Sequence, residues 1–323
     1  MNRKILIAAA LGALFAGATS AQQYPTRNVT MLVPFAAGGP TDTVARVTAQ
    51  AMGKPLGQTI VVENRPSAGG ILAPESVKNA KPDGYTILIH HIGMATTPAL
   101  YRQLRFDPLK DFEYIGLIND VPMTLIARQN FPANDFKEFL AYVKANKAKV
   151  TYANAGIGAA SHLCGMLFMS SIETDLLTVP YRGTAPAMND LLGGQVDFMC
   201  DQTTNTTSQI KSGKVKVYAV TSAKRLPSLP DVPTLQEVGL KGFEVGIWHA
   251  LYAPKGTPKE AIDKLVAALQ VAVKDADVNK RFADLGATAY PADKATPAAL
   301  QAHVKAEIDK WGPIIKKAGV YAD

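Results

Sequence analysis

The stretch NVTMLVPFAAGGPTD, residues 28–42, contains a strand, a glycine-rich loop and the start of a helix. Its first six residues are β-branched or apolar for the most part and end at Pro34, and a helical pattern follows over Thr43–Met52. Thr41 or Asp42 can cap that helix. A strand that leads through a short loop into a helix is the building unit of an α/β sheet.

The same alternation continues along the chain, without a repeat of fixed period. Further strands are predicted at Thr59–Val62, Tyr85–Ile89, Val121–Ala127, Val150–Tyr152, Leu177–Val179, Val196–Cys200, Val215–Thr221 and Gly246–Ala253. Further helices are predicted at Ala73–Asn79, Phe136–Asn146, Gly158–Ser171, around Met188–Leu192, and at Lys259–Lys274 and Thr296–Lys317. The sequence therefore predicts an α/β fold made of two successive units.

The chain has 323 residues, which suits two domains of roughly 150 residues each. We expect residues 22–120 and 246–323 to form a discontinuous first lobe and residues 121–245 to form the second. The return of the C-terminal segments to the first lobe is an expectation that leans on the family resemblance given below. It implies two strand crossovers, near Asp120–Val121 and Glu244–Gly246, which would act as a hinge.

Met1–Ala21 has the pattern of a secretory signal peptide. Arg3 and Lys4 precede the apolar segment Ile5–Ala18, and small residues lead to a cleavage site before Gln22. The alternative, a membrane anchor, would require an apolar run of about 20 residues. We expect a soluble protein exported to a bacterial periplasm.

Composition and charge narrow the class of protein. Hydrophobic residues make up 47% of the chain and both charge signs are abundant, which excludes a disordered chain. The net charge is +7, but the basic residues are scattered, so the sequence does not indicate a nucleic-acid partner. A mild positive field equally suits a small anionic ligand.

Cys164 and Cys200 stand 36 positions apart in a chain expected to enter an oxidising compartment. Two interpretations stay open: a disulfide, or two buried free thiols. The five histidines show no metal-ligand spacing with the cysteines. We therefore expect neither a metal nor a cofactor.

Two loops that follow strands and open helices carry the chemistry. In residues 34–42, Gly38 and Gly39 allow the backbone to approach a ligand, and in residues 154–162 Gly156, Gly158 and Ser161 repeat the arrangement. Exposed N–H groups at a helix N-terminus favour an anion. Either loop alone could be a glycine-rich turn with a helix cap, but the pair favours a carboxylate site between two lobes.

Residues in three other segments could add polar groups to this site. The Arg182 guanidinium can form two parallel hydrogen bonds to a carboxylate, and Tyr181 beside it could form an aromatic wall of the site. The alternative is that Arg182 forms a surface ion pair with an Asp and that Tyr181 is packed for structural reasons. In the predicted loop Cys200–Asn205, Asp201 would repel an anion and is interpreted as a local structural partner, whereas Thr203 can donate a hydrogen bond. His91 could reach the cleft or be satisfied by nearby backbone.

Catalytic motifs are absent from the sequence. It contains neither G-x-S-x-G nor H-E-x-x-H, and no pair of carboxylates stands out. We expect a binding protein that is not an enzyme; the alternative, a periplasmic hydrolase or isomerase, would need catalytic residues that the sequence does not reveal.

Nearly the whole mature chain resembles the Bug/TctC family, the periplasmic solute-binding receptors of tripartite tricarboxylate transporters. The matching segments are YPTRNVTMLVPFAAGGPTD (24–42), VVENRPSAGG (61–70), KPDGYTIL (81–88), TPALY (97–101), DPLKDF (107–112), GIGAASHL (156–163), VPYRGTAPAMNDLLGGQVD (179–197), SGKVKVYAVTSAKRLPSLPDVPTLQEVG (212–239) and APKGTP (253–258). The resemblance implies a two-lobed periplasmic-binding-protein fold whose cleft closes on an organic acid.

The resemblance also implies where the ligand is held. Backbone groups and ordered water from the loops after Val33 and Tyr152 would bind the carboxylate. By motif position the implied ligand-binding residues are Pro34, Phe35, Gly38, Gly39, Asp42, Ala155, Gly156, Gly158, Ser161, Tyr181 and Arg182. We expect a monomer that delivers its ligand to the membrane subunits of a tripartite transporter, or, as an alternative, is read by a sensor kinase.

The sequence departs from the family pattern at two places. Residues 90–93 are His-His-Ile-Gly where small residues are usual, and residues 201–204 are Asp-Gln-Thr-Thr. Both places are expected at the ligand, so His91, Asp201 and Thr203 join the candidate ligand-binding residues. Bulky hydrogen-bonding groups there would suit an aromatic or long-chain dicarboxylate.

Overall fold

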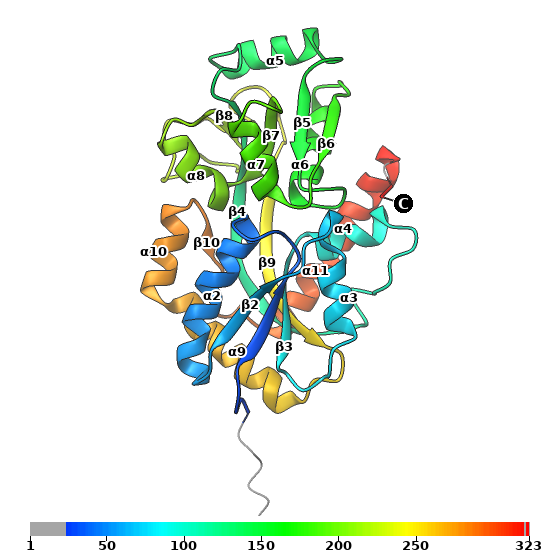
Figure 1. The fold of residues 1–323 in the computed structure, drawn as a ribbon, viewed down its shortest axis with the longest axis vertical. Helices are drawn as coiled ribbons and strands as arrows, with labels where there is room; N and C mark the ends of the chain where they lie inside the picture. The colour runs from blue at the N-terminus through cyan, green and yellow to red at the C-terminus, as the bar shows by residue number, and fades with distance from the viewer. Residues whose placement is uncertain (1–23, 320, 323) are drawn as a thin grey trace, which may run out of the picture.

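The computed structural model describes residues 24–319 and 321–322, which form two α/β lobes stacked along the long axis (Figure 1). The predicted signal peptide, Met1–Ala21, lies outside the described residues. Within residues 24–319, no helix is both long enough and apolar enough to cross a membrane.

The first lobe is built on a mixed sheet with the strand order β2-β1-β3-β9-β4. Its strands are β1 (Val29–Val33), β2 (Ile60–Asn64), β3 (Thr86–His91), β9 (Gly246–Pro254) and the first part of β4 (Phe112–Arg128). Strand β1 runs parallel to β2 and β3, and β9 runs antiparallel to β3 and β4. The loops after β1 and β3 therefore leave the same edge of the sheet, which faces the second lobe.

Helices cover this sheet, and those from the C-terminal part of the chain lie on the first lobe (Figure 1). They are α2 (Pro40–Leu56), η2 (Ala68–Gly70), α3 (Leu72–Lys78), α4 (Gly93–Leu100), α9 (Lys259–Lys274), α10 (Ala276–Asp284) and α11 (Pro297–Ala318). Helix α9 packs on α2 and β4, and α11 packs on α4 and β4. The short strand β10 (Thr288–Ala289) pairs with β4.

The second lobe continues the sheet from β4 in the order β4-β7-β5-β6, and β8 also pairs with β4. Its strands are β5 (Thr151–Asn154), β6 (Leu177–Pro180), β7 (Phe198–Gln202) and β8 (Val215–Val220). Its helices are α5 (Phe136–Ala145), α6 (Ala160–Ser171), α7 (Thr184–Leu192) and α8 (Thr203–Lys211). Helix α5 shows how the sequence specifies an element: the Asp135 side chain caps it by accepting from the Glu138 N–H, and it buries Phe136, Phe139 and Val143.

Strand β4 connects the two lobes. Its residues Phe112–Pro122 pair with β9, and from Met123 onward it pairs with β7 and β8. The predicted strand Val121–Ala127 was therefore too short. Polar residues such as Glu113, Asn119 and Asp120 interrupt the apolar pattern of the preceding segment, so the sequence does not indicate a strand there. The tertiary structure nevertheless places this segment between neighbouring strands.

Thr221 forms hydrogen bonds at the point where β4 passes from the first lobe to the second. Its hydroxyl accepts from the Met123 N–H at 2.8 Å and donates to the Val245 carbonyl at 2.6 Å, so both crossing segments meet at one side chain. This position supports, as a proposal, lobe boundaries near residues 120–121 and 244–246 and a hinge at that point.

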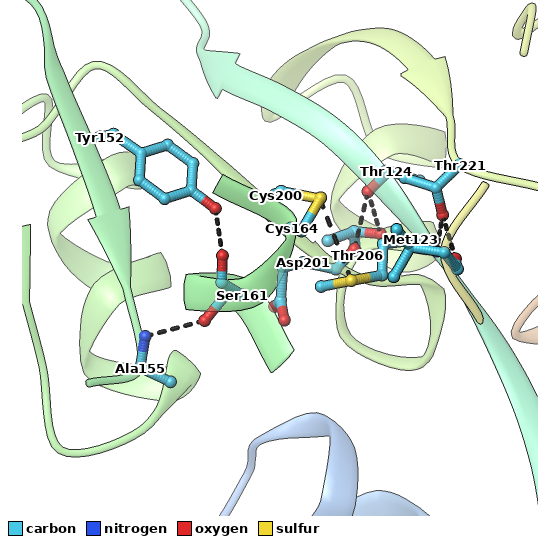
Figure 2. Close-up of a disulfide and its surroundings, with 11 residues drawn as sticks. Met123, Thr124, Tyr152, Ala155, Ser161, Cys164, Cys200, Asp201, Thr206 and Thr221 are labelled. Carbon is cyan, nitrogen blue, oxygen red and sulfur yellow. Dashed lines mark hydrogen bonds between the residues drawn. A yellow bond between two sulfur atoms is a disulfide. The ribbon is translucent and has the colours of Figure 1, made fainter. Parts of the chain in front are cut away.

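A disulfide joins Cys164 to Cys200, with the Cα atoms 6.1 Å apart (Figure 2). It ties α6 to β7, and of the two interpretations left open by the sequence the structure shows the paired one. The N-terminus of α6 is therefore held covalently to the strand that ends at Gln202.

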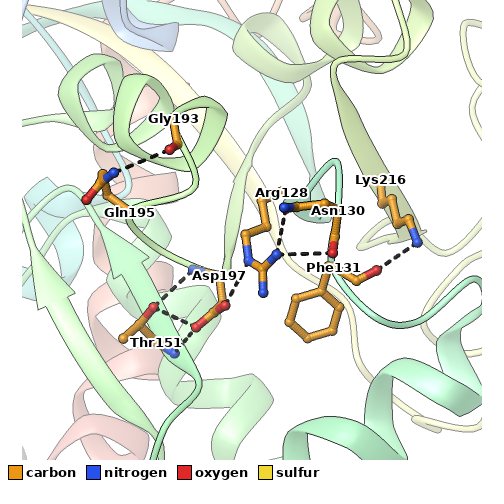
Figure 3. Close-up of polar contacts among 8 residues, drawn as sticks. All are labelled: Arg128, Asn130, Phe131, Thr151, Gly193, Gln195, Asp197 and Lys216. Carbon is orange, nitrogen blue, oxygen red and sulfur yellow. Dashed lines mark hydrogen bonds and ion pairs between the residues drawn. The ribbon is translucent and has the colours of Figure 1, made fainter.

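At the far end of the second lobe, the Asp197 side chain binds to both β4 and β5 (Figure 3). Its carboxylate accepts from Arg128 Nε at 3.0 Å and from the Thr151 N–H at 2.9 Å, and Lys216 Nζ donates to the Phe131 carbonyl at 2.7 Å. These contacts tie the end of β4 to the start of β5, and the start of β8 to the segment that follows β4, on the side of the second lobe that lies away from the first lobe.

One predicted loop is wrong. The segment Cys200–Asn205 is the end of β7 followed directly by α8, which begins at Thr203. Threonine is a weak helix former, so residues 203–207 show no helical pattern that local propensity would favour. Tertiary contacts stabilise α8 instead: the Thr206 hydroxyl bonds with Thr124 Oγ1 at 2.8 Å, and the Thr207 hydroxyl donates to the Leu285 carbonyl at 3.2 Å.

Candidate ligand-binding cleft

Four helices begin at one cavity between the lobes. The first residues of α2, α6 and α7 line it, and Gln202, the residue before α8, adds a polar side chain. The complete lining is Phe35, Pro40, Thr41, His91, Ala155, Ala159, Ala160, Ser161, Thr184 and Gln202. Apart from His91 no lining side chain is ionisable, so the electrostatic character of the cavity comes from the positive ends of helix dipoles.

Backbone donors remain available in this wall. Among the described residues, no acceptor pairs with the N–H groups of Thr41 and Asp42 in α2 or of Ala160 and Ser161 in α6. Unpaired N–H groups at a helix N-terminus can donate hydrogen bonds to a bound anion. Two such sets from opposite lobes can hold the two ends of a dianion.

Asp42 organises the first loop. Its carboxylate accepts from the Gly38 N–H, Arg46 Nε and Asn64 Nδ2, each at 2.9 Å, and Asn64 Nδ2 also donates to the Phe35 carbonyl. Burial opposes ionisation, but the hydrogen bonds from Arg46, Gly38 and Asn64 outweigh it and lower the pKa of Asp42. The carboxylate is thus fully engaged in shaping the loop and does not line the cavity.

The second loop is held by its own side chains. Ser161 Oγ accepts from the Ala155 N–H at 2.8 Å, and Asn154 Oδ1 accepts from the Gly156 N–H at 2.9 Å. The Tyr152 hydroxyl donates to the Ser161 carbonyl, as Figure 2 shows. Since the Ser161 oxygen accepts from the loop, its own hydrogen is free to donate to a ligand.

Three buried histidines stand where β3 meets β9. His91 pairs with His249 across the two strands, and the His90 ring meets the His91 ring edge-on at 4.9 Å. Burial lowers the pKa of His90 to about 4 and that of His249 to about 3, and it holds the pKa of His91 well below its ordinary range. All three rings are therefore neutral at neutral pH.

Only His91 of these three lines the cavity. His249 lies between Asn119 Oδ1 at 3.1 Å and Thr41 Oγ1 at 3.3 Å, and His90 Nε2 lies 3.3 Å from the Gly70 carbonyl. Within residues 24–319, no cluster of three His, Cys, Asp or Glu side chains is arranged to hold a metal ion.

The structure gathers some of the predicted site residues at the cavity and not others. Phe35, His91, Ala155 and Ser161 line it. The remaining predicted residues are Pro34, Gly38, Gly39, Asp42, Gly156, Gly158, Tyr181, Arg182, Asp201 and Thr203, which lie in the surrounding loops and elements and do not line it.

Four of these have other partners or surroundings. The Tyr181 hydroxyl donates to Asp190 at 2.6 Å, and Thr203 Oγ1 donates to the Gly286 carbonyl at 3.2 Å. Arg182 is exposed and forms no ion pair with another described residue. Asp201 is fully buried, bonded to Asn205 Nδ2 at 2.6 Å, and burial raises its pKa to about 7.

Sequence reasoning missed Pro40, Thr41, Ala159, Ala160, Thr184 and Gln202 as lining residues. All but Thr184 stand next to a residue that was singled out, and Thr184 lies two positions after Arg182; the helix starts could have pointed to five of the six. Gln202 was missed because Asp201 was interpreted as the strand end; the strand continues one residue further.

The lobes touch each other closely around the cavity. The Tyr101 hydroxyl of the first lobe donates to the Ile157 carbonyl of the second at 2.8 Å. Gly69 has a positive φ of 65°, and a Cβ there would lie 2.2 Å from the same carbonyl, so only glycine permits this approach.

The space enclosed by these contacts is small. The cavity volume of about 10 Å³ is room for a single water molecule. A larger groove of about 590 Å³, lined in part by Tyr101 and Ile157, lies at the lobe junction, but the helix N-termini of the cleft do not line it. A dicarboxylate can thus reach the cleft only if the lobes separate.

The comparisons with known proteins agree with this architecture. Residues 44–320 match the family described as "Tripartite tricarboxylate transporter family receptor". The chain belongs to this family. As a member of the TctC receptors, it has the two-lobed fold of a periplasmic binding protein, with the cleft between the lobes.

Solved structures of TctC-like proteins cover almost the whole chain. The periplasmic binding protein BugD is 58% identical, with a TM-score of 0.90 over 92% of this chain and 99% of BugD. MatC from Rhodopseudomonas palustris, solved with malate, is 42% identical, with a TM-score of 0.87 over 90% of this chain and 100% of MatC. Another R. palustris protein, solved with adipate, is 32% identical, with a TM-score of 0.87 over 92% of this chain and 99% of that protein.

Proposed function

We propose that this TctC receptor captures a small dicarboxylate in the periplasm and delivers it to the membrane subunits of a tripartite transporter. The observation that carries the proposal is the convergence of the α2, α6 and α7 N-termini on one cavity between the lobes. Their backbone donors stabilise a dianion without a basic side chain. The malate and adipate complexes of relatives 42% and 32% identical support the same ligand class.

Closure would complete the site. Separated lobes would each expose one half of the donor set to water, and the ligand would bridge the two halves. The closed form gains the direct contacts of Tyr101 with Ile157 and of Gly69 with the same loop. A ligand that binds the closed form better than the open one shifts the population toward closure.

The roles of individual residues follow from their positions. We assign anion binding to the backbone N–H groups of Thr41, Asp42, Ala160 and Ser161, and to the Ser161 hydroxyl. Asp42 is assigned the positioning of the first loop rather than ligand contact, since its carboxylate is engaged by Gly38, Arg46 and Asn64.

The test is a binding measurement on the chain from Gln22 to Asp323, the mature form that the predicted cleavage site gives. Succinate, malate, aspartate, adipate and phthalate are titrated by calorimetry, and each is screened for thermal stabilisation. A ligand at 100 times its Kd stabilises the fold by about 2.7 kcal/mol. A dicarboxylate that binds and is recovered unchanged supports a receptor; a consumed ligand, or no binding by any dicarboxylate, contradicts the proposal.

Delivery is tested separately from capture. Transport of the bound dicarboxylate into vesicles that contain the membrane subunits should require the receptor. Uptake that proceeds equally without the receptor would contradict the transporter partnership while leaving dicarboxylate capture intact.

A further inference from the structure

The two segments that connect the lobes meet at an acidic side chain. Strands β4 and β9 run side by side through the lobe junction (Figure 1), where β4 pairs Asp120 with Trp248 and Pro122 with Gly246. The Asp120 carboxyl packs directly on Gly246: a Cβ added to this glycine would lie only 2.6 Å from Asp120 Oδ1. Asp120 is half-buried and lies at the proposed hinge, residues 120–121 and 244–246.

No donor in the described chain compensates the charge of this carboxylate. Within residues 24–319 the Asp120 side chain accepts no hydrogen bond and forms no ion pair. The indole N–H groups of Trp248, its partner across the strands, and of Trp311 both donate to Glu307 Oε2 instead, at 3.1 and 2.9 Å. Removing a carboxylate from water without hydrogen bonds penalises its ionised form, whereas the neutral acid is tolerated.

The charged groups that face Asp120 are themselves acidic. Glu244 lies in the segment that returns from the second lobe, two residues before β9, and Glu307 lies on α11. Burial is the largest effect that raises the pKa of Asp120, and the charges of Glu244 and Glu307 add to it, so that the pKa reaches about 6. Tyr290 also faces Asp120, and burial raises the pKa of its hydroxyl, so this group stays neutral.

The basic and imidazole groups of this region lie beside Glu307. Lys310 Nζ is 3.8 Å from Glu307 Oε1. Burial lowers the pKa of His303, and the Glu307 charge offsets only part of that effect. The hinge therefore holds a carboxyl that is more easily neutral than charged while the lobes are together.

Building on the function proposed above, we propose that Asp120 makes closure of the cleft depend on pH: its neutral form favours the closed receptor, and its ionised form favours the open one. Separation of the lobes about this point moves Glu244 and Gly246 relative to the carboxyl and admits water to it, which stabilises the charge. Ligand binding, which requires closure, then takes up one proton from the solvent onto the Asp120 carboxylate. No other bond forms or breaks.

The direction and size of the effect follow from the two protonation states. Binding should be strongest near pH 4, where Asp120 is largely neutral even in the open form, and should weaken up to about pH 6, beyond which the dependence ends. The difference between the ordinary pKa of 3.8 and the value of about 6 in the closed form sets an upper limit of about 100-fold on the change in affinity.

Asp120→Asn keeps the shape of the side chain and removes its ionisation. Succinate, malate, aspartate, adipate and phthalate are titrated by calorimetry into the mature wild-type protein and the variant between pH 4 and pH 8. Because both proteins meet the same ionic form of the ligand at each pH, the ratio of the two Kd values reports Asp120 alone. The variant should bind up to about 100-fold more tightly than wild type at pH 8 and within about threefold at pH 4.

A second variant tests the hinge without changing Asp120. Glu244 is exposed, so Glu244→Gln should leave the fold intact while it removes one charge that opposes ionisation of Asp120. It should tighten binding at pH 8 by a smaller factor than Asp120→Asn. Glu260→Gln makes the same change at an exposed position of α9 and should leave the pH profile of wild type unchanged. Thermal unfolding reports whether each variant is folded.

The outcomes separate this inference from the proposed function. If folded Asp120→Asn binds a dicarboxylate with the pH profile of wild type, the inference is wrong and dicarboxylate capture stands. An equal shift of the profile by Glu260→Gln and Glu244→Gln would also overturn it, since net charge and not the hinge would then be responsible. If no dicarboxylate binds, the proposed function fails, and this inference fails with it.

Discussion

Replacing Ala160 by proline would remove one backbone N–H donor from the cleft, and the observed backbone conformation can accommodate proline at this position. Ala160 is the first residue of α6, and its N–H has no acceptor among the described residues. Ala159 has φ −73° and ψ 160°, the extended conformation that a residue before proline prefers. Proline is well accepted at this helix position, and Pro40 already occupies the same position of α2.

The expected loss follows from the charge of the ligand. A hydrogen bond to a charged group contributes about 1.5–3 kcal/mol, and each 1.4 kcal/mol is about tenfold in affinity. Ala160→Pro should therefore weaken dicarboxylate binding by about 10- to 150-fold. Isothermal titration calorimetry with a dicarboxylate that binds the wild-type protein measures this change.

Bulk is the competing explanation, because the proline ring would enter a cavity of about 10 Å³. Ala160→Val adds comparable volume and keeps the N–H, so it serves as the matched control and should bind more tightly than Ala160→Pro. Equal affinity of the two folded variants would refute the reasoning, since the loss would then come from crowding and not from the missing donor. Wild-type affinity in Ala160→Pro would show that this donor does not contact the ligand.

Three further predictions concern the disulfide, Asp201 and the contact between lobes. Replacing both Cys164 and Cys200 by alanine removes a crosslink between residues 36 positions apart, which should lower the free energy of unfolding by about 4 kcal/mol. Urea unfolding with and without reductant measures this loss, and an unchanged unfolding midpoint would contradict it. Burial raises the pKa of Asp201 to about 7, so its ionisation destabilises the folded state as the pH rises from about 4 to 7. Asp201→Asn should therefore gain stability over wild type by up to about 4 kcal/mol at pH 8 and much less at pH 5, and a difference that does not grow with pH would disprove the assignment. Tyr101→Phe removes the 2.8 Å bond to Ile157 and should speed ligand release about 2- to 13-fold, as measured by stopped flow; an unchanged release rate would mean that this bond does not hold the closed form.

Local patterns in the sequence were enough to predict most of the α/β elements. The strand and loop at residues 28–42 are specified locally, because β-branched residues favour β1 and the proline and glycines favour the loop. Helix α9 was predicted with its observed bounds, Lys259–Lys274, since its apolar residues recur at helical spacing. The family resemblance, carried by motifs along nearly the whole mature chain, was equally a property of the sequence.

Tertiary structure decided which polar residues line the cavity. Asp42 and Gly38 appeared in the binding motif, but contacts with Arg46 and Asn64 turn the carboxylate to the loop. Gln202 enters the cavity because β7 extends beyond Cys200, a length set by pairing with β4. The start of α2 meets the starts of α6 and α7, which follow it by more than a hundred residues in the chain, and no local pattern encodes where such segments meet. Local propensity thus favoured α2, α6 and α7 and their free N–H groups, while tertiary contacts stabilised α8 and long-range packing of the lobes decided that these helix starts share one cavity.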